Sequence, residues 1–113
     1  MRYKQIIHIL IIPLLCCCSA KTFKEPTPKE ITVKKDESFR VNLSENHKDG
    51  FTWQLDESYN REIIEYKNSV WEGNENGVFF YFKPIKIGST EITFIERKYD
   101  SIRNIKTITI FVK

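Results

Sequence analysis

Hydrophobic and polar residues alternate along most of the chain after residue 30, and a period of two is typical of half-buried β-strands. In the segment FRVNL, Phe39, Val41 and Leu43 alternate with polar neighbours. The segments with this pattern are residues 31–33, 39–43, 51–55, 90–96 and 105–112. Each is predicted to be a strand with one face toward a core.

Two further segments are strand candidates with a different pattern. Residues 77–82, GVFFYF, are strongly β-forming, carry aromatic residues on both faces and end shortly before Pro84. Residues 61–66, REIIEY, have a weaker pattern and are interpreted as a short strand. The only helix candidate, residues 55–66, has irregular apolar spacing, so no helix is predicted.

Short strands at this spacing are typical of an antiparallel sandwich or barrel. We therefore predict an all-β fold, an immunoglobulin-like antiparallel β-sandwich of about seven or eight strands spanning residues 30–113. Phe51, Trp53 and Leu55 share one face of the third main strand. Immunoglobulin-like sandwiches place a tryptophan in the core at this position, so Phe51 and Trp53 are expected to be core residues.

The first residues have the pattern of an export signal. Arg2 and Lys4 form a basic start, and residues 6–15, IIHILIIPLL, are almost wholly apolar. A membrane-spanning helix needs about twenty apolar residues, and this run is too short. The pattern predicts a secretory signal peptide over residues 1–17.

The signal ends in LLCCCSA, which resembles the lipobox of bacterial lipoproteins. In that family the signal is cut before a cysteine that carries the lipid, and a leucine stands three residues before it. Cys18 fits with Leu15, and Cys17 fits with Leu14. The resemblance implies an exported protein that is lipid-anchored to the bacterial cell envelope, periplasmic or surface-facing. The alternative is a plain secretory signal with incidental cysteines.

The segment after the lipobox has the composition of a linker. All three cysteines lie at 16–18, so the mature domain is predicted to have no internal disulfide. Residues 21–30, KTFKEPTPKE, contain two prolines, several charges and one aromatic residue. Such a composition cannot bury a core, so residues 18–29 are predicted to be the lipidated cysteine and a flexible tether.

Charge and composition exclude several functions. Lysine and arginine number 18 against 15 acidic residues, a net charge of +3 that becomes nearly neutral without the signal. Lysines alternate with glutamates and form no basic stripe, so no nucleic-acid partner is expected. His47 is the one histidine after the signal, which is too few ligands for a zinc site.

No catalytic constellation is convincing. Ser44, His47 and Asp49 are close in sequence, but residues on one short turn seldom converge as a triad requires. Gly73 and Gly77 lack the lysine and helix of a phosphate-binding loop. We expect a protein that is not an enzyme and needs no cofactor.

Residues 46–53, NHKDGFTW, resemble the signature loop of the chagasin-like inhibitors of papain-family cysteine proteases. That loop is usually Asn-Pro-Thr-Thr-Gly followed by an aromatic residue, a variable residue and tryptophan. Asn46, Gly50, Phe51 and Trp53 match, whereas residues 47–49 replace the Pro-Thr-Thr centre.

Two later features agree with the same family in order and spacing. Gly73 and Gly77 precede a strand whose Phe80 stands eight residues before Gly88. Arg97-Lys98-Tyr99 then stands where the family commonly has Arg-Pro-Trp. The resemblance extends from about residue 31 to residue 113.

The resemblance implies a monomeric, reversible and non-covalent inhibitor that blocks the cleft of a papain-like cysteine protease with three loops, at residues 46–50, 73–77 and 97–101. The first loop would enter the cleft beside the catalytic cysteine, and the others would clamp its walls. The implied protease-binding residues are Asn46, His47, Lys48, Asp49, Gly50, Phe51, Gly73, Asn74, Gly77, Arg97, Lys98 and Tyr99.

Other interpretations stay open on the sequence. The altered loop centre also suits an immunoglobulin-like envelope lipoprotein that binds another protein or glycan without inhibiting a protease. The three loop glycines also suit simple turns, and Arg97 and Tyr99 also suit an ordinary exposed hairpin. Trp71 fits either a rim contact or a cover of the core.

Overall fold

The computed structural model describes residues 20–113, and these residues form eight strands and no helix. The strands are β1 (Lys21–Lys24), β2 (Glu30–Val33), β3 (Phe39–Leu43), β4 (Thr52–Leu55), β5 (Ile64–Trp71), β6 (Val78–Pro84), β7 (Gly88–Lys98) and β8 (Ser101–Val112). The predicted signal peptide and the candidate lipidation sites Cys17 and Cys18 lie outside the described residues.

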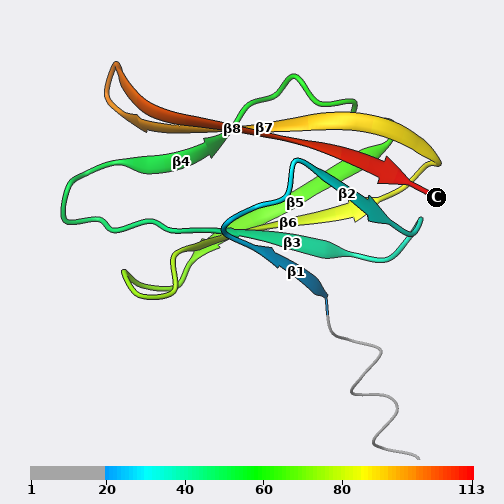
Figure 1. Cartoon of the computed structure of the whole chain (residues 1–113), viewed down its shortest axis with the longest axis horizontal. Coiled ribbons are helices and arrows are strands. Elements are labelled where there is room, and N and C mark those ends of the chain that lie inside the picture. Colours follow the sequence, from blue (N-terminus) through cyan, green and yellow to red (C-terminus); the bar gives the residue numbers. More distant parts are fainter. Residues whose placement is uncertain (1–19) are drawn as a thin grey trace, which may run out of the picture.

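Two four-stranded sheets pack face to face, as Figure 1 shows. One has the order β1-β3-β6-β5 and the other β2-β8-β7-β4. The pairs β1/β3 and β2/β8 are parallel, and the other neighbours are antiparallel. The predicted immunoglobulin-like β-sandwich is confirmed.

The core lies between the sheets and follows the alternation in the sequence. Phe39, Val41 and Leu43 of β3 are buried on one side, and Ile108 and Ile110 of β8 are buried on the other. Aromatic rings meet across the layers, because the ring centroids of Phe80 and Phe94 are 4.9 Å apart. Burial of these side chains is the main stabilising contribution to the fold.

The tether prediction needs correction at residues 21–24, because β1 is part of a sheet. Lys21 to Lys24 pair in register with Phe39 to Asn42 of β3. The Phe23 ring packs edge-on against Phe39, with centroids 6.0 Å apart. The backbone pairing with β3, which makes β1 the edge strand, and this aromatic contact hold a segment whose composition cannot form a core by itself.

The weaker strand prediction at 61–66 is displaced. Residues 61–63 are a turn, and β5 runs from Ile64 to Trp71 along β6. Much of β5 is exposed, so pairing rather than burial defines it, and hydrophobic periodicity does not mark its second half. Between residues 20 and 113 no helix is long and apolar enough to cross a membrane.

Candidate functional site

Three connections meet at one end of the sandwich, at the left in Figure 1. We name them the first loop (residues 44–51, between β3 and β4), the second loop (72–77, between β5 and β6) and the hairpin tip (99–100, between β7 and β8). The strand register fixes their position, because Val78 pairs with both Leu43 and Trp71. Thr52, at the end of the first loop, pairs with Arg97 beside the hairpin tip.

The first loop closes on itself through its own polar side chains. The backbone N–H of Lys48 donates to Asn46 Oδ1 at 3.0 Å, and the N–H of Phe51 donates to Asp49 Oδ1 at 3.0 Å. Short side chains that accept from the backbone two residues on favour turns. Gly50 has φ +83°, a region that suits glycine. These contacts make the tip a defined turn.

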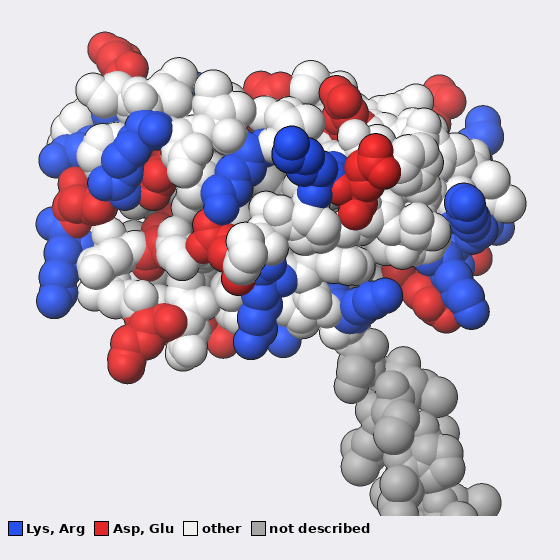
Figure 2. Space-filling view, in the orientation of Figure 1, with Lys and Arg blue, Asp and Glu red and all other residues white. Residues whose placement is uncertain are grey.

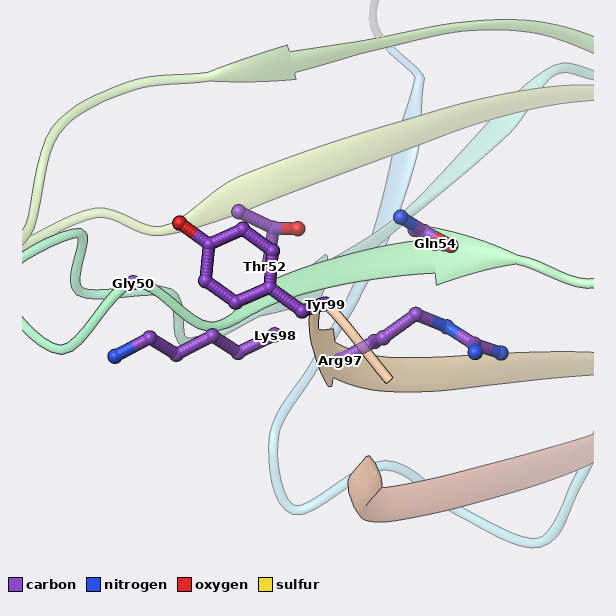
Figure 3. A pocket seen from close by; sticks show the side chains of 6 residues that line it. All are labelled: Gly50, Thr52, Gln54, Arg97, Lys98 and Tyr99. Carbon is purple, nitrogen blue, oxygen red and sulfur yellow. The ribbon is translucent and has the colours of Figure 1, made fainter. Parts of the chain in front are cut away.

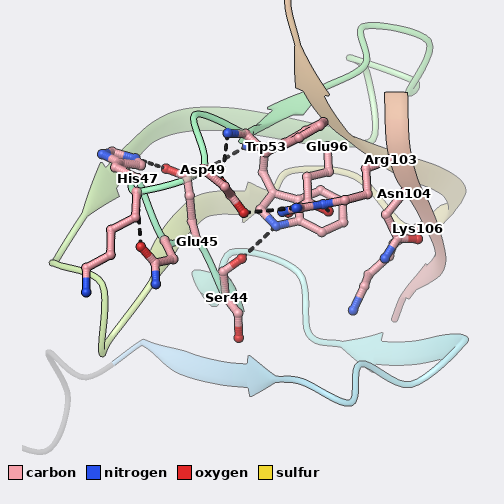
Figure 4. Close-up of polar contacts among 12 residues, drawn as sticks. Ser44, Glu45, His47, Asp49, Trp53, Glu96, Arg103, Asn104 and Lys106 are labelled. Carbon is pink, nitrogen blue, oxygen red and sulfur yellow. Dashed lines mark hydrogen bonds and ion pairs between the residues drawn. The ribbon is translucent and has the colours of Figure 1, made fainter. Parts of the chain in front are cut away.

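A buried carboxylate, Glu45, holds the base of the first loop (Figure 4). Its side chain is 5% exposed. Glu45 Oε1 accepts the backbone N–H of Trp53 at 2.6 Å, and Oε2 lies 2.6 Å from His47 Nε2. The sequence analysis missed Glu45. Its signal was available, because Glu45 continues the inward alternation of Phe39, Val41 and Leu43.

His47 and Trp71 join the first and second loops. Their rings stack with centroids 3.9 Å apart and an interplanar angle of 14°. The backbone N–H of His47 donates to Asn74 Oδ1 at 3.0 Å, and Trp71 Nε1 donates to the backbone carbonyl of Glu45 at 3.0 Å. Trp71, which the sequence left between two roles, is a bridge between the loops and is 42% exposed.

Arg103, also missed by the sequence analysis, connects the first loop to β8. The register of β7 and β8 shifts between Glu96 and Arg97, which pair with Asn104 and Ile102. Arg103 is therefore the extra residue of a β-bulge, a feature that re-aims side chains. Its guanidinium donates to both oxygens of Glu96, at 2.8 and 3.1 Å, and to Asp49 Oδ2 at 2.9 Å.

These contacts change the acid–base properties of the pair. The N–H of Phe51 and the guanidinium of Arg103 outweigh the slight desolvation of Asp49 and hold the pKa of its carboxyl below the usual value. Hydrogen bonds to Glu96 and Asp49 in turn raise the pKa of Arg103. Both groups therefore stay charged at neutral pH and hold the first loop against β8.

The expectation that Phe51 is a core residue is wrong, whereas Trp53 is buried as predicted. Phe51 is half-buried and lies outside the core cluster. The Arg103 guanidinium covers it instead, 4.0 Å from the ring centroid. The reason is that β4 begins at Thr52, so Phe51 belongs to the loop and does not follow the strand's alternation.

The hairpin tip presents Tyr99 to solvent. Tyr99 has φ +52° and is 87% exposed. A left-handed φ at the first of two turn residues suits a tight hairpin, but it is strained for a bulky side chain. The sequence pattern does not distinguish a two-residue turn at residues 99–100 from a longer loop. This turn geometry could therefore not be predicted.

A hollow of about 290 Å³ lies between the hairpin tip and the first loop. Its lining consists of Gly50, Thr52, Gln54, Arg97, Lys98 and Tyr99. Figure 3 shows the Tyr99 ring beside Thr52, whereas Arg97 extends the other way, toward Gln54. Within residues 20–113, Arg97 Nε is buried without a hydrogen-bond partner. Arg97 is thus set back from the loop end.

The second loop depends on its glycines to different degrees. Gly77 has φ +76°, and a Cβ there would lie 2.2 Å from the Leu43 carbonyl oxygen. Gly73 has φ +95° with open space around it. Gly77 therefore permits the backbone of the second loop to lie close to the end of β3, and Gly73 and Asn74 form the outer turn.

All twelve predicted site residues lie at the loop end or beside it, although Phe51 is covered and Arg97 points away. The rejected triad is not assembled: Ser44 N bonds Glu25, His47 contacts Glu45, and Asp49 contacts Arg103. In the described part of the chain, no three His, Cys, Asp or Glu side chains gather as a metal site.

The fold is similar to that of two solved proteins. The crystal structure of the cysteine protease inhibitor EhICP2 from Entamoeba histolytica has a TM-score of 0.71 at 13% identity, over 83% of this chain and 95% of that chain. The solution structure of amebosin has a TM-score of 0.57 at 19% identity, over 84% of this chain and 99% of that chain. No protein-family model and no curated protein match the sequence. At these low identities the likeness shows a shared fold: this chain folds as a cysteine protease inhibitor of Entamoeba histolytica does.

Proposed function

We propose that this chain is a reversible, non-covalent inhibitor of papain-like cysteine proteases that blocks the active-site cleft with the three loops. The observation that carries the proposal is the set of contacts that joins the loops, on a fold similar to that of EhICP2. The Glu45–His47–Trp71 contacts connect the first two loops, and Gly50 lies against the Lys98 side chain beside the hairpin tip.

Rigidity is what such an inhibitor needs. A loop that is already ordered loses little conformational entropy on docking, so more of the contact energy contributes to affinity. Tight enzyme–inhibitor pairs bury about 800 Å² on each partner. In this proposal the three adjacent loops at one end of the sandwich supply that area.

The contacts also separate loop residues that brace from residues that are free to bind. The side chains of His47 and Asp49 are held by Glu45 and Arg103, although both stay partly exposed. Lys48 is exposed, and among the described residues its ammonium has no ion-pair partner. In this proposal Lys48 replaces the uncharged centre of the family loop as the group that approaches the protease.

The direct test is a titration of residues 20–113 against papain and a panel of cathepsins with a fluorogenic peptide substrate. We expect reversible inhibition that depends on inhibitor concentration and leaves the inhibitor uncleaved. Absence of inhibition of every enzyme at micromolar inhibitor would contradict the proposal.

A second candidate is an immunoglobulin-like envelope lipoprotein that binds another protein or a glycan. The observation that favours it is the charged centre at 47–49, where the inhibitor family has Pro-Thr-Thr. A pull-down from an envelope extract that recovers one protein or glycan and no protease, together with a negative titration, would favour this candidate.

We also infer export and lipid anchoring from the lipobox-like segment. In this proposal residues 1–17 are removed and Cys18, or Cys17, carries the lipid on the bacterial cell envelope. Metabolic labelling with a palmitate analogue tests it: Cys18→Ser should abolish labelling. Labelling that persists in Cys18→Ser and is lost in Cys17→Ser would move the site to Cys17.

A further inference from the structure

The direction of β1 determines where the N-terminal segment leaves the domain. Lys21 pairs with Phe39, at the start of β3, and Lys24 pairs with Asn42, next to the first loop. The chain therefore enters β1 at the end opposite the loops. Cys18 precedes Lys21 by three residues, which span at most about 10 Å. A lipid on Cys18, as proposed above, would therefore be attached within reach of that end.

Three chain segments meet at this opposite end. The Lys35 N–H donates to the Lys113 carbonyl at 2.9 Å, and the Asp36 N–H donates to the Pro84 carbonyl at 2.8 Å. Gly88, after the β6–β7 turn, pairs with Val112. We name this area the basal surface and define it by its exposed residues Lys21, Lys34, Lys35, Lys86, Ile87 and Lys113.

The basal surface combines positive charge with an exposed apolar residue. Figure 2 shows several basic side chains, with some acidic ones beside them, at the right-hand end, where Figure 1 places the C-terminus; other basic side chains lie at the opposite end. Acidic neighbours on the same turn are Asp36 and Glu37, and Asp36 lies 3.6 Å from Lys35. The other four lysines have no ion-pair partner in the described part of the chain.

Ile87 supplies the apolar component, since it is 65% exposed at the turn between β6 and β7 and follows Lys86. Glu65 lies near this end, since it pairs with Lys83 of β6, and it is 3.5 Å from Lys67. Asp56, Glu57 and Glu62 belong to the β4–β5 connection, at the upper edge in Figure 1. That edge is away from β1, so the positive excess lies on the side where the chain enters.

We propose that the basal surface is a contact for anionic lipid headgroups. Each lysine near an anionic membrane strengthens binding by about fivefold, and an exposed isoleucine can enter the headgroup boundary. A lipid anchor would add to this by keeping the domain at high local concentration over the bilayer. The three loops at the other end then point away from the membrane.

The test uses residues 20–113, which include every core residue, so that the surface contact is measured without the lipid. Lysine acetylation is followed by mass spectrometry at low ionic strength, with and without phosphatidylglycerol vesicles. We expect severalfold slower acetylation of Lys34, Lys86 and Lys113 on the vesicles, with unchanged rates at Lys48 and Lys98. Uniform rates, or protection at the loop end, would overturn the proposal.

Two controls separate charge from non-specific adsorption. Phosphatidylcholine vesicles should give no protection, and equal protection on them would overturn the headgroup contact. Lys86→Glu should weaken co-sedimentation with phosphatidylglycerol vesicles by at least fivefold. Lys67→Glu, an equal charge reversal on exposed β5, should have a much smaller effect. Equal effects of the two variants would show that net charge alone binds the vesicles.

Discussion

At the residue scale, Arg103 does the most to hold the site in place. It contacts the exposed Asp49, the buried Glu96 and the Phe51 ring at once. No sequence pattern marks it, because its orientation results from the bulge in β8, and a bulge depends on the register with a partner strand. By contrast, Asn46, Asp49 and Gly50 act through local turn chemistry, which is why the sequence could predict a turn there.

We expect Arg103→Ala to weaken inhibition by at least about tenfold. It removes the contact that holds Asp49 and leaves Glu96, which is 8% exposed, without its donors. The free energy of unfolding should also fall, because the buried carboxylate loses its hydrogen-bond donors. Urea unfolding and the inhibition constant measure the two effects. Arg103→Lys keeps the charge but not the fork of donors, so its values should be intermediate. An unchanged inhibition constant in Arg103→Ala would contradict the bracing role.

The two glycines of the second loop give a matched comparison. Gly77→Ala should lower the free energy of unfolding by about 2–4 kcal/mol, since its Cβ collides with the Leu43 carbonyl in addition to the backbone strain. Gly73→Ala meets open space and carries only the strain, about 1 kcal/mol. Thermal unfolding of both variants measures the difference. Similar losses would mean that the close approach at Gly77 relaxes easily.

At the scale of elements, the strands with strict alternation were predictable and those defined by pairing were not. Segments such as 39–43 and 105–112 carry their own inward faces, so the sequence alone identifies them. β1 and the second half of β5 depend on hydrogen bonds from a neighbouring strand. Amino-acid composition assigned residues 21–24 to a tether, because composition does not show whether a neighbouring strand is available for pairing.

If β1 is a structural element, removing its aromatic contact should destabilise the domain. Phe23→Ala should lower the free energy of unfolding by about 1–3 kcal/mol, because the half-buried ring leaves Phe39. Lys24→Ala, on the same strand but exposed, should change it by less than about 0.5 kcal/mol. Chemical denaturation measures both. Equal stability of Phe23→Ala and the unmodified domain would show that β1 contributes nothing.

The segment after β1 predicts a dependence on pH. Burial of Glu25 opposes its ionisation, but the bonds from Lys106 and the Ser44 N–H outweigh burial and lower its pKa. A carboxyl with a lowered folded-state pKa stabilises the fold above its unfolded pKa, and this contribution is lost as pH falls through the folded value. Asp49 acts in the same direction.

Unfolding midpoints should therefore fall as pH decreases below about 4, the usual range of carboxyl pKa values. Glu25→Gln should be less stable than the unmodified domain at pH 7 and should show a shallower decline in acid. Midpoints from thermal scans across this range give the measurement. If the unfolding midpoints of the two proteins fall equally with pH, Glu25 contributes nothing to the loss of stability in acid.

At the scale of the whole molecule, the three loops lie at one end of the sandwich and the chain enters β1 at the other. The fold class could be predicted from the alternating strands, and the resemblance to the inhibitor family implied that three loops lie at one end. The division of the first loop into bracing residues and free residues could not be predicted, because Glu45, Trp71 and Arg103 come from separate strands or loops. Only the assembled structure shows that His47 and Asp49 have side-chain partners, whereas Lys48 has no ion-pair partner among the described residues.

This division predicts that Lys48 determines which protease is inhibited. An exposed charge on a binding loop changes association rates and partner choice more than it changes the fold. Lys48→Glu should slow association by about tenfold or more with any inhibited protease that has acidic residues beside its cleft, and the effect should shrink at high salt. Lys67→Glu, which changes the net charge equally but lies on β5 outside the three loops, should leave the rate within about twofold. Stopped-flow association across a salt series distinguishes the two variants. Identical salt slopes for Lys48→Glu and the unmodified domain would place Lys48 outside the interface, and the proposed orientation of the first loop in the cleft would then have to be abandoned.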